Sequence, residues 1–222
     1  MKYVTIDLEM NPLAKEYKAE RAICCREVIE IGAILLDENY QEIDSFKTFV
    51  KPQFNDVIKP HIQKLTNISN DMVENAPFFE EALQMFCSWC KSIGDDILLY
   101  QWSESDIEQI RNEMNLKGIS SDDSNQIFLS NWFDLQREFG DKLNLSNAVS
   151  LKNAVMYAGI DFEGTEHDAL DDARNTAILL KIIRIPELCE AALKYVLEAL
   201  NPAPISTSLG SMIDFTELGF IA

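Results

Sequence analysis

An alternation of apolar and polar side chains at the start of the chain predicts a β-strand over residues 3–9. Its apolar face consists of three branched side chains, Val4, Ile6 and Leu8. Asp7 and Glu9 lie on the other face, so both carboxylates point the same way. A strand with an apolar face is expected in the middle of a sheet, where two carboxylates repel each other unless a cation lies between them. The strand therefore predicts either a metal site or a solvated acidic face.

Further strands and helices are expected in an order typical of an α/β fold. Strands are predicted at residues 28–36, from the turn at 37–40 through 49, at 97–102 and at 128–135. Helical patterns cover residues 60–69, 70–93, 105–118, 151–158, the segment capped by Asp168, and 186–200. Antiparallel strands followed by helix-linked strands predict a mixed sheet with helices on both faces.

Composition favours one globular domain with a small appendage, because the chain has 222 residues and is 47% hydrophobic. The sequence contains no stretch of eighteen apolar residues and no cleavage pattern of a signal peptide, so we expect a cytoplasmic protein without membrane association. The five cysteines are odd in number and are expected to be free thiols. Cys87 and Cys90 have the spacing of a zinc site, but their amphipathic helical setting favours core packing.

Net charge limits the possible partners. The 37 acidic and 19 basic residues give a net charge of −18, which argues against tight binding of a polyanion. Turnover at a chain end remains compatible with this charge, because bound metal ions neutralise an acidic cluster and few phosphates are held.

Three more polar residues are candidates for chemistry. Asp106 falls in the first turn of a predicted helix, where an acid commonly serves only to complement the helix dipole. His167 lies just outside the helix capped by Asp168, and Asp172 follows in that helix. The spacing places an imidazole and a carboxylate near one helix end, although His167 could also be an ordinary polar residue.

Three segments together resemble the DEDDh 3′-to-5′ exonucleases of the DnaQ-like superfamily. They are Ile6-Asp7-Leu8-Glu9-Met10, the segment from Trp102 to Asp106, and the segment from His167 to Asn175. Finer features are similar to the branch of enhanced-RNAi and histone-mRNA 3′ exonucleases and KapD, namely the segments 27–33, 46–52, 65–68 and 132–135. Ser103 departs from that branch, which usually has glycine after the tryptophan.

The resemblance implies a ribonuclease H-like fold with a central five-stranded mixed sheet and an exonuclease domain at residues 1–185. It also implies two divalent cations, Mg²⁺ or Mn²⁺, held by four carboxylates. In this interpretation Asp7 is shared by both metals, Glu9 and Asp172 bind one of them, and Asp106 binds the other. His167 is the general base, and nucleoside 5′-monophosphates are released from 3′ ends.

Single-stranded nucleic acid is the expected partner, with RNA favoured over DNA because of the branch resembled. A DNA exonuclease of the proofreading or repair type is the alternative with the same chemistry. A non-catalytic acidic interaction module is the alternative of another class, which the charge supports and the intact acidic set opposes. Residues 186–222 are expected to form a helix and an apolar tail that docks on the domain or binds a protein partner.

Overall fold

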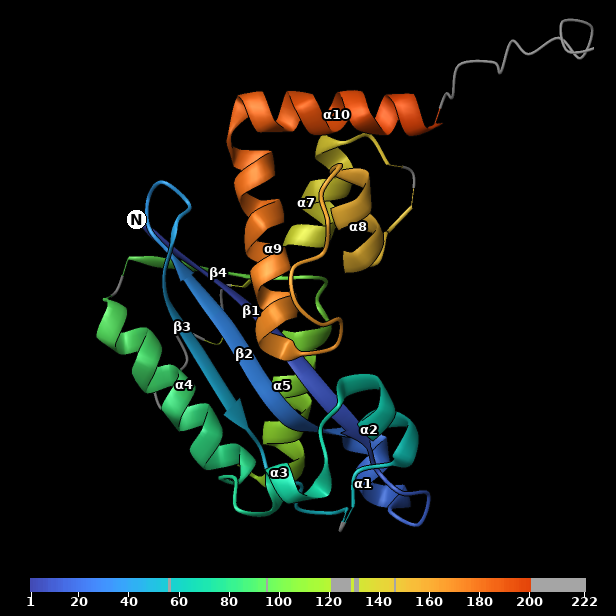
Figure 1. The fold of residues 1–222 in the computed structure, drawn as a ribbon. Coiled ribbons are helices and arrows are strands. Elements are labelled where there is room, and N and C mark those ends of the chain that lie inside the picture. The colour runs from blue at the N-terminus through green and yellow to red at the C-terminus, as the bar shows by residue number, and fades with distance from the viewer. Residues whose placement is uncertain (56, 95, 121–128, 130–131, 146, 201–222) are drawn as a thin grey trace, which may run out of the picture.

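The computed structural model describes residues 1–55, 57–94, 96–120, 129, 132–145 and 147–200. A five-stranded sheet in the order β3-β2-β1-β4-β5 forms its centre (Figure 1). The strands are β1 (Lys2–Pro12), β2 (Arg26–Leu36), β3 (Glu42–Phe49), β4 (Ile97–Gln101) and β5 (Trp132–Asp134). β1 pairs antiparallel with β2 and parallel with β4, so the expected mixed sheet is confirmed, with β1 at its centre.

Helices cover both faces of the sheet. The described helices are α1 (Lys18–Ile23), α2 (Pro60–Thr66), α3 (Asn70–Glu74), α4 (Phe79–Ile93), α5 (Ser105–Lys117), α7 (Leu135–Lys142), α8 (Leu151–Tyr157), α9 (Ala169–Arg184) and α10 (Pro186–Leu200). On one face, the apolar side of β1 packs against α4 and α5 through Ile6, Phe86 and Ile110. On the other face, β2 and β4 pack against α7 and α9. This layering turns the polar side of β1 toward α9.

Several predicted boundaries were wrong. The helix expected over residues 70–93 is two helices, because Pro77 lies between α3 and α4, where its ring prevents a continuous helix. The strand expected over 128–135 pairs only over Trp132–Asp134 within its described part, and Leu135 already begins α7. Helices α1 and α7 were not predicted.

The C-terminal helix α10 packs against the domain, since Ala192 and Val196 are buried in the cluster that contains residues of α8 and α9. The tail at residues 201–222 lies outside the described residues, so its docking and the domain boundary near residue 185 stay predictions. Cys87 and Cys90 lie on the buried side of α4 and pack in the core, as predicted. Within the described parts of the chain, no helix has both the length and the apolar character needed to cross a membrane.

Candidate metal and active site

The polar face of β1 lies beside the first turns of α9. Thr5 Oγ1 donates a hydrogen bond of 2.8 Å to the carbonyl oxygen of Ala173, which ties the strand to the helix. Asp7 and Glu9 follow on the same face of β1 and pair across the ladder with Gly32 and Glu30 of β2. The two carboxylates therefore lie on the side of the sheet that α9 covers.

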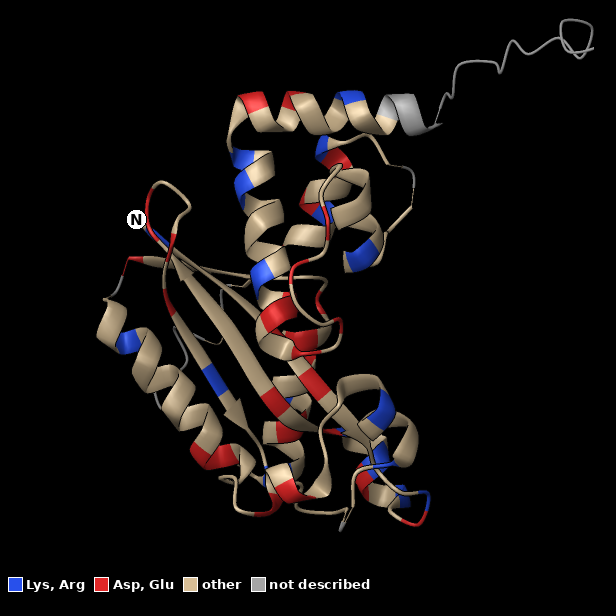
Figure 2. Ribbon diagram, in the orientation of Figure 1, with Lys and Arg blue, Asp and Glu red and all other residues tan. Residues whose placement is uncertain are grey.

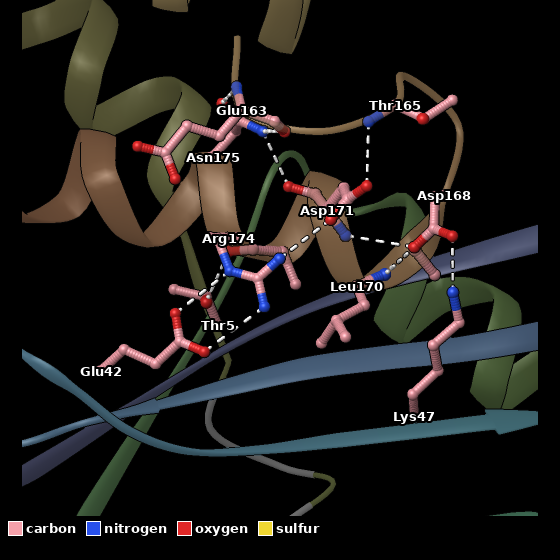
Figure 3. A network of polar contacts seen from close by, with 12 residues as sticks. Thr5, Glu42, Lys47, Glu163, Thr165, Asp168, Leu170, Asp171, Arg174 and Asn175 are labelled. Atoms are coloured by element: carbon pink, nitrogen blue, oxygen red, sulfur yellow. Dashed lines mark hydrogen bonds and ion pairs between the residues drawn. The ribbon is translucent and has the colours of Figure 1, made fainter.

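A buried carboxylate of β2 fixes the start of α9. Glu30 is 1% exposed, and its Oε2 accepts the backbone N–H of Ala169 at 2.9 Å. Lys47 of β3 lies 3.0 Å from Glu30 Oε1 and 2.5 Å from Asp168 Oδ2, so one ammonium group joins the sheet to the capping residue of α9 (Figure 3). Sequence patterns did not identify Glu30 or Lys47, because their partner lies more than a hundred residues away in the chain.

Hydrogen bonds at the helix terminus order the loop that carries His167. Asp168 caps α9 by accepting the backbone N–H groups of Leu170 and Asp171, as its position predicted. Asp171 in turn accepts the backbone N–H of Thr165 at 2.9 Å and pairs with Arg174 (Figure 3). The loop therefore has a defined conformation on both sides of His167.

His167 lies over the carboxylates at the edge of the site. Its backbone has a φ of 65°, in the left-handed region that few residues other than glycine adopt, and its N–H donates to Asp172 Oδ2 at 3.3 Å. Its Nδ1 lies 3.9 Å from Glu9 Oε1, and its side chain is 46% exposed. Ligand atoms of Glu9, His167 and Asp172 all lie within 4.8 Å of one another. This is the spacing that a bound cation or a water molecule between acid and base requires.

Asp106 reaches the same site from the opposite side. It lies in the first turn of α5, is 3% exposed, and is followed by Ile107, whose N–H donates to the side chain of Gln101 at the end of β4. Burial raises the pKa of Asp106 to about 8, with a smaller opposing effect of the positive charge of Arg26 and a further increase from Asp172. Asp106 is therefore close enough to Asp172 for the two carboxylates to repel each other.

The pKa values of the remaining carboxyl groups are raised as well. The pKa of Asp7 is raised well above its ordinary value, first by burial and then by Asp106 and the other acids. Burial and the charge of Asp172 raise the pKa of Glu9 to about 9. Burial raises the pKa of Asp172 to about 7, partly offset by the hydrogen bond from His167. Four carboxyl groups with raised pKa values in one place are unfavourable unless protons or cations neutralise them.

The donor set fits divalent metal ions. Asp172 Oδ1 is buried, and it has no hydrogen-bond partner within the described residues. No described N–H or O–H group donates to the carboxylates of Asp7 or Asp106 either. Hard cations such as Mg²⁺ and Mn²⁺ prefer such free carboxylate oxygens. The structure thus brings together all five residues that the sequence predicted, while their individual roles stay predictions.

The sheet order, with carboxylates on and around its central strand, is that of the ribonuclease H-like fold class. The chain belongs to the Exonuclease family (RNase_T), whose family model matches residues 4–180, and within it to the DEDDh exonucleases. Membership of this family implies the use of divalent metal ions.

Two curated relatives illustrate the range of the family. ERI1 exoribonuclease 2 of Mus musculus is 29% identical over 83% of this chain and 30% of the relative. The PolC-type DNA polymerase III of Caldanaerobacter subterraneus is 31% identical over 78% of this chain and 11% of the relative. The chain thus spans about a third or less of the length of these relatives.

One solved structure shows the same fold. The nuclease domain of 3′hExo, a DEDDh family member bound to rAMP, superimposes with a TM-score of 0.69 at 22% identity. The match covers 84% of this chain and 92% of that domain.

Proposed function

We propose that this chain is a metal-dependent 3′-to-5′ exonuclease that shortens single-stranded RNA and releases nucleoside 5′-monophosphates. One observation carries the proposal: the carboxylates of Asp7, Glu9, Asp106 and Asp172 converge from three segments that are distant in sequence. Among the described residues, the only hydrogen bond that this group accepts is the one from the His167 N–H to Asp172 Oδ2, and Asp172 Oδ1 is buried without a partner. Membership of the DEDDh family supports a metal-binding role for these carboxylates.

In this proposal the four carboxylates hold two divalent cations, Mg²⁺ or Mn²⁺. Such ions activate water as a nucleophile and stabilise negative charge on the leaving oxygen. Asp7 is the proposed shared ligand, and its carboxylate is close enough to Asp106, Asp172 and Glu9 for each of them to raise its pKa. Ligand atoms of Glu9 and Asp172 lie near those of His167, so these two carboxylates would hold one ion, and Asp106 would hold the other.

His167 acts as the general base. Its Nδ1 lies 3.9 Å from Glu9 Oε1, so the imidazole is close to the proposed ligands of the ion that would activate water. Histidine is the side chain that most often accepts a proton in general acid–base catalysis. The exposed side chain of His167 can then pass that proton to solvent.

RNA is the favoured substrate because the first relatives are named exoribonucleases and 3′hExo was solved with rAMP. A DNA substrate is the alternative, since one relative is a DNA polymerase and E. coli Exonuclease I was solved with DNA oligonucleotides. A cytoplasmic location, and a protein partner for residues 201–222, also belong to the proposal.

The deciding experiment is digestion of RNA and DNA of one sequence, labelled at either end, with Mn²⁺, Mg²⁺ or EDTA. Immediate release of a 3′ label and a ladder from a 5′ label, both abolished by EDTA, are expected. Asp7→Asn should abolish cleavage, whereas Asp141→Asn, which changes an exposed carboxylate on α7, should not. No cleavage with any metal would favour the non-catalytic interaction module.

A further inference from the structure

Basic residues are concentrated at the end of the sheet that α1 and α2 cover. Residues 13–26 and 59–64 hold six of the 19 lysines and arginines of the chain but only two of its 37 acids. We call these six residues the basic cluster: Lys15, Lys18, Arg21, Arg26, Lys59 and Lys64. Figure 2 shows a blue segment on α2, blue and red segments around α1, and red segments on β1, which α2 contacts.

No ion pair joins the basic cluster to a carboxylate of the described residues, although the charge of Arg26 acts on Asp106. Elsewhere, cations such as Lys47, Lys117 and Arg174 form ion pairs, whereas within the described part of the chain none of the six does so. Arg21 Nη1 and Lys59 Nζ instead donate to the same neutral acceptor, the carbonyl oxygen of Leu13, at 2.5 and 3.3 Å. Two cations held near one carbonyl group leave a site that favours an anion.

The basic cluster borders the acidic site. Lys59 donates its backbone N–H to the side chain of Asn11, two residues after Glu9 on β1. Leu13 follows Glu9 by four residues, which is roughly 13 Å of extended chain. Arg26 pairs with Pro12 at the end of β1, and its charge lowers the pKa of Asp106. A strand whose 3′ end lies at the carboxylates therefore reaches the cluster within a few nucleotides.

We propose that the basic cluster binds phosphate groups of the substrate strand upstream of the bond that is cleaved. The proposal rests on the proposed exonuclease function and adds how a chain with a net charge of −18 holds a polyanion. Lysine and arginine contacts with phosphates supply affinity without reading sequence. Because the contacts lie upstream, they affect the binding of long strands and leave the chemical step unchanged.

The test compares Lys18→Gln/Lys64→Gln with the matched control Lys91→Gln/Lys142→Gln, which removes the same charge from exposed positions on α4 and α7. Steady-state cleavage of a dodecamer and of a dinucleotide RNA is measured over a range of salt concentrations. For the cluster variant, the KM of the dodecamer should rise about tenfold at low salt. The slope of log KM against the logarithm of the salt concentration should fall by about 0.7 for each phosphate contact that is lost. The KM of the cluster variant for the dinucleotide should stay within about twofold of that of the unmodified protein. The KM of the control variant should stay within about twofold for both substrates.

Equal dodecamer KM values for the two variants would overturn the proposal while leaving the exonuclease function intact. If the unmodified protein cleaves nothing, that function fails, and anisotropy of a labelled dodecamer in EDTA tests the cluster by itself. Weaker dodecamer binding by the cluster variant alone would then support it. Binding of polyglutamate without binding of RNA would overturn it in favour of an acidic protein partner.

Discussion

Gly32 of β2 lies so close to Ala169 of α9 that a Cβ atom at residue 32 would be 2.2 Å from the carbonyl carbon of Ala169. Gly32 also pairs with Asp7 across the ladder. The missing side chain thus allows the start of α9, with His167 and Asp172, to approach the carboxylates of β1. Close packing of backbone against backbone sets the width of the site.

Gly32→Ala should therefore push α9 away from the sheet. We expect a loss of about 1–3 kcal/mol in the free energy of unfolding from overpacking. Cleavage should fall by roughly 10²-fold, because a displacement of about 1 Å misaligns catalytic groups. Urea unfolding and single-turnover kinetics measure both effects.

Gly140→Ala is the matched control, because nothing lies within 4 Å of a Cβ atom there and Gly140 is inside α7. This change should stabilise the protein by about 0.5–1 kcal/mol and leave cleavage unchanged. Full activity of Gly32→Ala would show that the approach of α9 does not determine the geometry of the site.

Local sequence patterns placed several residues of this site, but only the resemblance to the DEDDh exonucleases joined Asp106, His167 and Asp172 to the strand carboxylates as one predicted site. Asp7 and Glu9 follow from strand alternation, and Asp168 from its capping position. Glu30 and Lys47 could not be predicted, since their roles depend on contacts between distant segments. The short helices α1 and α7 could not be predicted either, because each is too short for a repeated helical pattern of apolar residues.

Stability of the metal-free protein should depend on pH through the site carboxyl groups. In the folded chain the pKa values of Glu9, Asp106 and Asp172 are about 9, 8 and 7, whereas in the unfolded chain they are about 4. Between these limits the folded state binds protons that the unfolded state has released. The contribution of these three groups to stability is therefore greatest below about pH 4 to 5, and it is lost as the pH rises toward 9.

Urea unfolding in EDTA at about pH 5, 7 and 9 measures this slope, which is about 1.4 kcal/mol per pH unit for each extra proton bound. Mn²⁺ should reduce the loss, and its stabilising effect should grow with pH because it displaces protons. Asp172→Asn should flatten the slope. An unfolding free energy in EDTA that rises from pH 5 to 9 would contradict the arrangement of charges described above.

His167→Ala should lower kcat by roughly 10²-fold or more while metal affinity stays nearly unchanged, as expected for a base that does not itself bind metal. Calorimetric titration with Mn²⁺ and cleavage of a dinucleotide measure the two properties. His61→Ala on α2 is the control and should leave both unchanged. Loss of metal binding in His167→Ala would instead make His167 a ligand, which its proximity to Glu9 and Asp172 permits.

Ser103 occupies a backbone conformation that favours glycine, with a φ of 79°. A side chain with a Cβ atom is strained at this φ, so serine should be less favourable here than the glycine that is usual in the branch resembled. Ser103→Gly should stabilise the protein by about 1 kcal/mol through relief of that strain. Ser92→Gly, inside α4, should destabilise it by about 0.5–1 kcal/mol, and thermal unfolding compares the two.

Lys117 of α5 joins two fully buried carboxylates, with its Nζ 3.2 Å from Glu27 Oε1 and 2.7 Å from Glu113 Oε1. Glu27 also accepts backbone N–H groups of the loop after β3, including that of Gln53 at 2.7 Å. Glu113 accepts the N–H of Val28 at 2.8 Å. This network fixes α5, and with it Asp106, against β2.

Lys117→Met leaves both buried carboxylates without a counter-charge, so it should cost about 3–5 kcal/mol of unfolding free energy. Adding Glu113→Gln removes one of these charges and should restore part of the loss, because a buried pair is less costly to replace than to break. Lys142→Met at an exposed position of α7 should change stability by less than about 0.5 kcal/mol. If the double variant were less stable than Lys117→Met alone, hydrogen bonding by Glu113 would outweigh its charge in holding α5 on the sheet.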